Sequence, residues 1–443
     1  MSTLYDLMVQ RIILPMFDLI TGSQTVPYMD HLNRTESLNY DEMKALQMDK
    51  LKQVLDNAHQ NLDIYSTVEY HENPEIFIKN FPVTERSHVL TEDPSRLIKN
   101  HNKRGKYYTS GGSTAANAHV YLTNHEYSCA QATQLHWLRK IGYKYGDRIL
   151  QIGILKKHRD LSKRVKDVLL NTDFIYYFEL SEQERVDALK RNSRNKNLFY
   201  IGFPNIAIEI MDLCIKHNIN LMFKGILSYG ELLTEEAYNS LKTYFKCQIL
   251  NTYGCQEGVL ICSGLKPNMM PIMMQNTYLE IMDDYNNPVE EGVLGNILLT
   301  NLNAFNMPLI RYRIKDCGTV ITASNHNTFN RDVMIDIAGR DNDYLYTPEG
   351  GRYHLFTVSG DANFIKKKVL QFQWHQRALD HIQIKYIPKP GLEWTEEDKI
   401  EYTKLAKDKF HSDAIKLEFV AVDELTRHRS GKVQRVINDL IDN

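Results

Sequence analysis

Several short segments, far apart in the chain, carry side chains able to bind phosphate, a divalent cation or a nucleoside. The stretch YYTSGGSTAANAHVYLT, residues 107–123, is rich in hydroxyl residues and glycine. Such residues can wrap a polyphosphate, because hydroxyls and backbone N–H groups donate hydrogen bonds and glycine permits close approach. The candidate phosphate-binding residues are Thr109, Ser110, Gly111, Gly112, Ser113 and Thr114. No Gly-Lys-Ser/Thr follows, so this is not a Walker A loop, and alone it is better explained as an ordinary glycine–serine loop.

Two further segments supply groups that suit a nucleotide. The segment NTYGCQEG follows the strand-like CQIL and contains Tyr253, Gly254 and Glu257. Tyr253 can stack on a flat base, and Glu257 can hold a divalent cation. The segment MPLIRYRIKDCG contains Asp316, a carboxylate suited to accept hydrogen bonds from a diol such as ribose.

Three other segments add charged or small residues. SYGELLTEEA places Gly230 and Glu231 just after an apolar strand, AGRDND contains Arg340, and RHRSGKVQR carries Lys432 in a polar turn. Each has a plain structural explanation, since such strings are common turns and such charges often form surface ion pairs or stay exposed. The order and spacing of the whole set favour a common function.

The intervening sequence predicts an α/β architecture for the larger, N-terminal part. Residues 51–97 have a mainly helical pattern, and LLNTDFIYYFEL, NLFYIGF and INLMFKGIL follow as strands separated by helices such as NIAIEIMDLCIKH. This alternation predicts a largely parallel sheet. TYLEIMDD, GNILLTNL and GTVITAS predict a smaller β-subdomain after about Asn276.

A domain boundary is expected near IAGRDNDYL, dividing the chain into residues 1–340 and 341–443. In the second part, HIQIKYI and IKLEFVAV predict strands and TEEDKIEYTKLAKDKF predicts an amphipathic helix between them. The tail DELTRHRSGKVQRVINDL predicts a polar loop followed by a helix. The fold expected is therefore a large α/β part of several subdomains and a small α+β C-terminal domain.

Bulk composition excludes some classes of function. The 443 residues carry a net charge of -2, which argues against a nucleic-acid-binding protein that relies on a broad basic field. The N-terminal segment MSTLYDLMVQRIILPMFDLITGS is apolar but interrupted by charges and proline. It resembles neither a signal peptide nor a membrane span, and a helix packed on the body or on a partner is expected.

Cysteine usage indicates a reducing compartment. None of the six cysteines forms a Cys-x-x-Cys pair, so a cytoplasmic location is expected rather than a disulfide framework. Cys255, Cys262 and Cys317 could meet as zinc ligands, although ordinary buried thiols are the simpler interpretation.

Taken together, the segments resemble the adenylate-forming superfamily of acyl-CoA synthetases, adenylation domains and luciferases. The resemblance covers residues 107–435 and is closest to the phenylacetate-CoA ligases and the CapK-type proteins. The chain length, the N-terminal RIILPMFDLITG and the sequence GGRYHLFTVSGDANFIKKKVLQFQ favour that branch.

The resemblance implies a role for each candidate residue. Residues 110–114 would form the pyrophosphate-binding loop, Gly230 and Glu231 would line the adenine site, and Tyr253 would stack on adenine. Glu257 would bind Mg²⁺, and Asp316 would bind the ribose hydroxyls with help from Arg340. Lys432 would be the lysine of a mobile lid, which would turn about a hinge at residue 341 or 342.

The chain departs from the superfamily pattern in ways that leave its charged groups in place. The phosphate loop has an extra glycine, with Ala115 and Asn117 where glycine and proline are usual. YRIKD replaces Tyr-Arg-Thr-Gly-Asp, Asn342 stands where a hinge aspartate is common, and YGCQE has glutamine where Thr or Ser is usual. These changes bear on the geometry of the loops and on the rate.

The resemblance implies ATP-dependent activation of a carboxylic acid, with ATP and Mg²⁺ required and pyrophosphate released. The acceptor would be coenzyme A or a carrier-protein thiol, and an amine or hydroxyl acceptor is the alternative. A catalytically degenerate nucleotide-binding relative and an unrelated transferase are the other hypotheses. Neither a nucleic acid nor a membrane span is expected, and a homodimer is possible. His136, Trp137, Tyr143 and Tyr229 either line the acid pocket or are ordinary packing residues.

Overall fold

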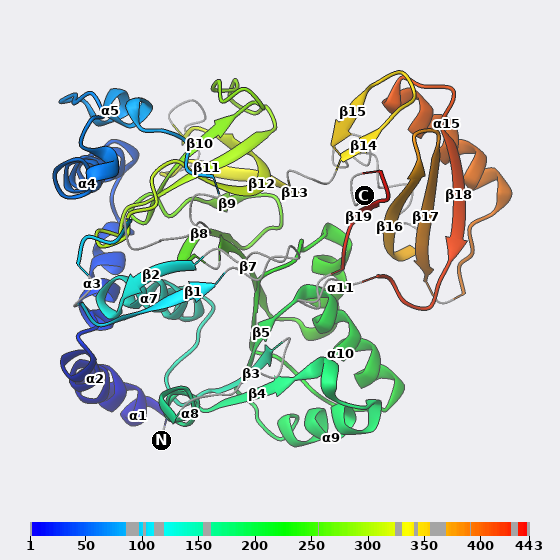
Figure 1. Ribbon diagram of the computed structural model, residues 1–443. Coiled ribbons are helices and arrows are strands. Elements are labelled where there is room, and N and C mark those ends of the chain that lie inside the picture. Colours follow the sequence, from blue (N-terminus) through cyan, green and yellow to red (C-terminus); the bar gives the residue numbers. More distant parts are fainter. Residues whose placement is uncertain are drawn as a thin grey trace. The chain divides into compact units, whose positions relative to one another are not determined.

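A computed structural model describes most of the chain (Figure 1). The described residues are 2–85, 97–100, 103–109, 119–153, 161–255, 257–323, 330–340, 344–354, 369–389, 391–426 and 433–440. They divide into two compact units, one formed by residues 1–314 with 318–337 and the other by 338–443 with 315–317. The expected functional boundary between a core and a lid, at 340/341, stays a prediction.

Helices dominate the first eighty residues. In chain order they are α1 (Ser2–Met8), the π-helix η1 (Val9–Ile13), α2 (Leu14–Thr21), α3 (Thr25–Thr35), α4 (Tyr40–Asn61), the short η2 (Asp63–Tyr65) and α5 (Pro74–Asn80). Gly22 ends α2 with a φ of 71°, a left-handed conformation that glycine adopts without strain. Asn39 begins α4 with a capping box, in which its side chain and that of Glu42 each accept a backbone N–H.

A six-stranded sheet confirms the α/β prediction. Its order is β4 (Thr172–Tyr176), β3 (Arg148–Gly153), β5 (Leu198–Gly202), β6 (Gly225–Ser228), β7 (Gln248–Cys255) and β8 (Val259–Gly264). The first five strands run parallel, and β8 pairs antiparallel with β7. The strand in INLMFKGIL begins only at Gly225, later than the apolar pattern indicates.

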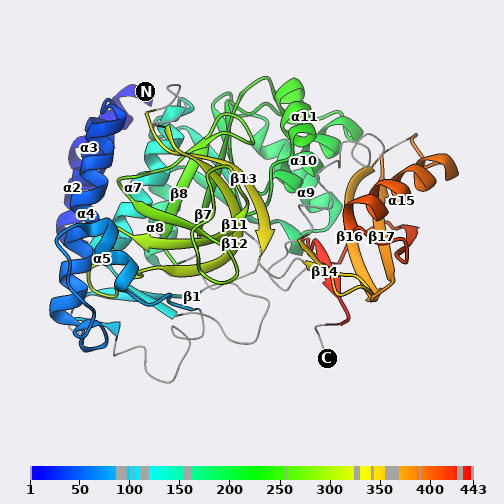
Figure 2. The ribbon, with the colours of Figure 1, turned by 90° about the horizontal axis from the view of Figure 1, so that it is seen from above.

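Alternating side chains of these strands build two cores, one on each face of the sheet. Leu150, Tyr200 and Ile226 pack with α9 (Glu182–Asn192), α10 (Pro204–Lys216) and α11 (Glu235–Phe245). Ile149 and Phe199, which point the other way, pack with α7 (Asn124–Lys140) and the N-terminal helices. Figures 1 and 2 show α9, α10 and α11 together on one side of the sheet and α7 on the other. A strand buried on both faces reads as a continuous apolar run, which is why β5 was recognised in the sequence.

The predicted β-subdomain is present as a five-stranded sheet. Its order is β10 (Thr277–Met282), β11 (Gly295–Asn301), β12 (Tyr312–Ile321), β13 (Val333–Arg340) and β9 (Met270–Pro271). Strand β12 begins at Tyr312, six residues before the predicted GTVITAS, so the YRIKD motif is part of a strand. A separate hairpin pairs β1 (Gly105–Thr109) with β2 (His119–Thr123), which leads directly into α7.

The second unit has its own sheet and core. Strands β18 (Lys416–Ala421), β17 (His381–Pro388), β16 (Val369–Ala378) and β19 (Val436–Asn438) are covered by α15 (Glu396–Phe410), and β14 (Tyr344–Tyr346) pairs with β15 (Arg352–His354). The predicted strands β17 and β18 and the predicted helix α15 are confirmed. The helix predicted for the tail is wrong, because residues 436–438 pair parallel with β16 instead.

Candidate functional site

The carboxyl edge of the parallel sheet brings most of the described candidate residues to one region. Strands β3, β5, β6 and β7 all end there. Because β4 and β5 lie on opposite sides of β3, the order of the strands reverses between β3 and β5. Ligands of open α/β sheets bind in the crevice outside such a switch point. Gly230 and Glu231 follow β6, and Tyr253 and Gly254 end the neighbouring strand β7.

The loop after β6 is fixed by two neighbouring strand ends. The backbone N–H of Tyr229 donates to the Gly202 carbonyl at 3.1 Å, and the Tyr229 hydroxyl donates to the Ile152 carbonyl at 3.2 Å. Gly230 has a φ of 81°, and a Cβ there would lie 2.7 Å from the Phe203 ring. Only glycine meets both conditions, so this position is set by the close packing of the loop against Phe203.

Glu257 lies in the short connection between β7 and β8. The register of the two strands shifts after Tyr253, and Gly258 turns the chain with a φ of 90°. This turn leaves the Glu257 side chain only 7% exposed. The hydroxyl of Tyr312, itself buried at the start of β12, donates to Glu257 Oε1 at 2.9 Å.

A buried carboxylate oriented by a second side chain fits the chemistry of a Mg²⁺ site. Mg²⁺ prefers oxygen ligands and is usually held by one or two carboxylates together with substrate phosphates. Hydrogen bonds to a ligand from outside the metal's coordination sphere fix its orientation. Burial, followed by the nearby Glu257 charge, raises the pKa of the Cys255 thiol well above its usual range, so Cys255 stays protonated beside the carboxylate.

Asp316 lies half-buried in β12, directly after a strained residue. Lys315 has a φ of 63°, where the superfamily pattern expects glycine. Residues 84 and 85 hold the start of the strand. The Thr84 N–H donates to the Arg311 carbonyl and the Thr84 carbonyl accepts the Arg313 N–H, each at 3.0 Å, and Arg313 Nε lies 2.7 Å from Glu85. The left-handed turn at Lys315 therefore fixes the backbone from which Asp316 projects.

Other predicted site residues fall outside what the structure describes. Residues 110–114 and Lys432 are not among the described residues, and neither are the hinge candidates 341 and 342. The backbone of Arg340 ends β13, but its side chain is not described. Strands β1 and β2, on either side of the predicted phosphate loop, pair with Thr109 opposite His119.

Two residues of the site were missed in the sequence. Tyr312 opens the YRIKD motif, and a tyrosine at a motif boundary is a usable signal. Lys315 is marked in the sequence only by standing where the superfamily pattern has glycine. Trp137 and Tyr143, considered for an acid pocket, are buried in the core beside α7, and burial lowers the pKa of His136 to about 4.

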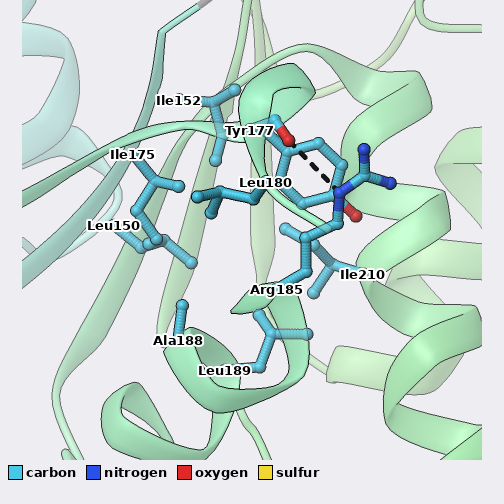
Figure 3. A pocket seen from close by; sticks show the side chains of 9 residues that line it. All are labelled: Leu150, Ile152, Ile175, Tyr177, Leu180, Arg185, Ala188, Leu189 and Ile210. Atoms are coloured by element: carbon cyan, nitrogen blue, oxygen red, sulfur yellow. Dashed lines mark hydrogen bonds between the residues drawn. The ribbon is translucent and has the colours of Figure 1, made fainter. Parts of the chain in front are cut away.

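Two cavities among the described residues of the first unit lie away from these candidate residues. A space of about 10 Å³ beneath the sheet is lined mainly by aliphatic side chains, and Arg185 Nε donates to the Tyr177 carbonyl there at 3.2 Å (Figure 3). It has room for about one water molecule. A larger groove of about 590 Å³ lies between the end of α2 and the start of α7.

None of the six cysteines forms a disulfide. Five of the six are buried and Cys255 is intermediate. Burial raises the pKa of Cys129, Cys214 and Cys247 to about 11. Within the described ranges, no three His, Cys, Asp or Glu side chains converge as metal ligands, so the zinc alternative gains no support there. None of the described helices has the length and apolarity needed to cross a bilayer.

Comparison of the sequence with known proteins finds similarity to CapK-type proteins. Residues 345–439 match the family model described as the CapK C-terminal domain. The chain is 22% identical over 372 residues to "Protein CapK" of Staphylococcus aureus, and the match covers 81% of each chain.

Solved structures share the fold over most of the chain. A 2-hydroxyisobutyryl-CoA ligase in the postadenylation state, in complex with 2-HIB-AMP, superposes with a TM-score of 0.70 at 15% identity, covering 90% of each chain. The anthranilate CoA ligase AuaEII in complex with anthranoyl-AMP gives a TM-score of 0.55 at 17% identity, covering 76% of this chain and 67% of that one. ATP-bound MatB from Rhodopseudomonas palustris gives 0.53 at 14% identity, covering 74% and 66%.

These findings confirm the predicted resemblance to the adenylate-forming superfamily and its CapK-like branch. They also confirm the predicted fold, a mixed α/β body with a separate C-terminal domain.

Proposed function

We propose that this protein activates a carboxylic acid with ATP and transfers the acyl group to a thiol. The observation that carries the proposal is the buried Glu257, which the Tyr312 hydroxyl orients. Glu257 follows β7 at the carboxyl edge of the sheet, and β7 pairs with β6, the strand that leads into the Gly230–Glu231 loop. The shared fold supports the proposal, since two of the similar structures are named as CoA ligases and hold 2-HIB-AMP or anthranoyl-AMP, and MatB holds ATP.

In the first step, an oxygen of the substrate carboxylate attacks the α-phosphorus of ATP. The bond from this phosphorus to its bridging oxygen breaks, and pyrophosphate leaves with the electron pair. Two anions must approach each other, so the barrier is mainly electrostatic and orientational. We assign Tyr253 to the adenine, Asp316 and Arg340 to the ribose, and residues 110–114 to the departing pyrophosphate.

Glu257 would hold Mg²⁺, which when bound neutralises charge on the phosphates. Lys432 would place its ammonium beside the reacting carboxylate and the α-phosphate, where a compact charge on a long stem is suited to a mobile domain. In the second step the thiolate sulfur bonds to the acyl carbon, the carbon–oxygen bond to the phosphate breaks, and AMP leaves. We propose that residues 341–443 act as a lid that moves between the two steps.

The thiol of coenzyme A or of a separate carrier protein is the acceptor we favour, because the 2-hydroxyisobutyryl and anthranilate neighbours above are named as CoA ligases. An amine or hydroxyl acceptor is the second candidate. We place the reaction in the cytoplasm, in accord with six cysteines that form no disulfide.

Pyrophosphate release from ATP, measured over a panel of small hydroxy acids and aromatic acids with hydroxylamine as acceptor, tests the proposal. We expect release with one acid class. Lys432→Ala should lower it about 100- to 1000-fold, the typical cost of removing a preorganised charge. Lys416→Ala, which removes an exposed lysine from β18 of the same unit, should leave it unchanged.

The result that would overturn the proposal combines two observations. These are an absence of release with every acid and an absence of ATP binding by calorimetry. ATP binding without release would instead support a nucleotide-binding protein that has lost catalysis. The strained Lys315 before Asp316 is the observation that favours this second candidate.

A further inference from the structure

The N-terminal helices are apolar on two sides, because Val9, Ile13 and Leu14 pack on the protein body while a second set of apolar side chains faces solvent. From α1 to the end of α2, large apolar side chains recur every three or four residues on the solvent side. We call them the N-terminal apolar face: Leu4, Leu7, Met8, Ile12, Met16, Phe17, Leu19 and Ile20. Leu19 is 85% exposed and Ile20 is 70% exposed, while Asp6 and Asp18 of the same helices are buried.

The two buried carboxylates hold the helices in this orientation. Asp6 accepts the backbone N–H of Tyr145 at 2.8 Å, and Asp18 accepts the backbone N–H of Val26 at 2.8 Å. Turning the helices to bury the apolar face would break both bonds and leave two mostly buried carboxylates without these partners. The exposed apolar face is therefore a consequence of specific anchoring.

Further contacts fix the segment at both ends. The Tyr5 hydroxyl donates to the Leu169 carbonyl at 2.9 Å, and the Tyr5 ring packs against Gly146, where a Cβ would lie 2.8 Å away. At the other end, the Asn124 amide donates to the Thr21 carbonyl at 2.8 Å. The segment is thus a docked part of the first unit, with one side against the body and the other toward solvent.

The exposed charges within this face and on the groove beside it are positive. Between residues 4 and 22, all of them described, Arg11 is the only exposed charged side chain. The groove of about 590 Å³ begins at Leu19 and Ile20, and Lys103 and Arg104, both exposed, line its other side. Glu126, also in the groove, is buried and accepts the backbone N–H groups of residues 305 and 306, so its charge is turned inward.

We propose that the N-terminal apolar face docks the protein onto an anionic phospholipid surface. A helix that lies in a bilayer interface buries its apolar side among the acyl chains while cations contact the lipid phosphates. The groove, with an aliphatic wall and a basic wall, has the same two-part chemistry. The proposal is independent of the proposed reaction.

A second copy of this chain fits the same face less well. A two-fold symmetric contact would place the face against itself, because both partners of an isologous interface use the same surface. Arg11 of one copy would then find no exposed carboxylate between residues 4 and 22 of the other copy to pair with. An anionic membrane supplies the missing negative charge.

Co-sedimentation of the full chain with vesicles tests the proposal. Binding is expected to vesicles of phosphatidylcholine mixed with phosphatidylglycerol, to be much weaker with phosphatidylcholine alone, and to fall with added salt. Leu19→Ser combined with Ile20→Ser should weaken binding by roughly tenfold or more. Arg11→Gln should weaken it by about fivefold.

Ile400→Ser is the matched control, since Ile400 on α15 is also 70% exposed but belongs to the other unit. It should bind vesicles as the wild type does. Circular dichroism and thermal melting establish that each variant is folded. A second measurement uses a variant that still binds: the tryptophan fluorescence of Leu19→Trp should be quenched by vesicles of brominated phosphatidylglycerol.

Two outcomes would overturn the proposal. One is wild-type protein that stays in the supernatant with the anionic vesicles. The other is a wild-type dimer in light scattering that becomes a monomer in the Leu19→Ser, Ile20→Ser double variant, while vesicles bind neither protein. That result would show that a second copy covers the face.

Discussion

The Tyr312–Glu257 hydrogen bond is expected to contribute both to the stability of the protein and to the Mg²⁺ requirement, and the two contributions can be measured separately. Tyr312→Phe removes the hydroxyl and leaves a buried carboxylate without this donor. We expect the free energy of unfolding to fall by about 1–3 kcal/mol, the usual cost of such a loss. If Glu257 holds Mg²⁺, the Mg²⁺ concentration for half-maximal pyrophosphate release should also rise severalfold.

Tyr28→Phe is the control for this prediction. The Tyr28 hydroxyl is buried and donates to Asn276 at 2.5 Å, so its removal should also lower stability. It should not change the Mg²⁺ requirement. An equal shift in both variants would contradict a specific role for Tyr312.

Lys315 allows a direct test of backbone strain. A side chain in the left-handed region costs roughly 1–2 kcal/mol, and glycine avoids this cost but adds flexibility to the unfolded chain. Lys315→Gly should therefore raise the free energy of unfolding by up to about 1 kcal/mol. Lys315→Ala keeps the strain and should change little. Chemical denaturation of the two variants side by side decides, and a more stable Ala variant would refute the strain argument.

At the scale of elements, one carboxylate joins the hairpin β1–β2 to the β-subdomain. Glu126 closes the capping box of α7, accepting the N–H and hydroxyl of Thr123, and it also accepts two backbone N–H groups at 2.7 Å from the segment after β11. All four donors face a buried anion. Such charge-assisted bonds are stronger than neutral ones.

Glu126→Gln should accordingly destabilise the protein by about 2–4 kcal/mol, because an amide can direct an N–H at groups that need an acceptor. Glu42→Gln changes the same position of the capping box of α4, which is exposed, and should cost only a few tenths of a kcal/mol. Thermal unfolding of both variants measures the difference. Equal melting temperatures would show that the two additional bonds contribute nothing.

The sequence predicted elements well where local pattern and tertiary contact agree. β5 and α15 carry apolar patterns that match their burial, and both were found. Residues 436–438 have helical spacing but add to the edge of β16, because pairing with an existing strand outweighs weak local propensity. The Tyr312–Glu257 contact was out of reach, since it joins residues 55 apart through the relative placement of two sheets.

For the whole molecule, the buried histidines predict a loss of stability in mild acid. Burial lowers the pKa of His136 and of His31 to about 4, against an ordinary value of 6.5. Between these pH values the unfolded chain binds protons that the folded chain does not. The free energy of unfolding should therefore rise from pH 4 to pH 6.5 and gain nothing further from these groups above it.

His136→Gln tests this dependence. His136 is 5% exposed, near Glu36, Lys140 and Arg139, and contacts Asn33. In the variant, the slope of the free energy of unfolding against pH should fall by the contribution of one proton, about 1.4 kcal/mol per pH unit between about pH 4 and 6.5. Urea denaturation at several pH values measures the slope. An unchanged slope would mean that His136 titrates normally in the folded protein.

The shielding of the six thiols has a practical consequence for following motion. A maleimide dye reacts with exposed, ionisable thiols, and burial with raised pKa values keeps the native cysteines from competing. One new cysteine on an exposed site of each unit, such as Lys416→Cys with Tyr285→Cys, would then carry a donor and an acceptor fluorophore on an otherwise unmodified chain. Energy transfer between the two dyes, followed in single molecules as ATP and an acid are added, would report directly whether the C-terminal unit changes position during the reaction.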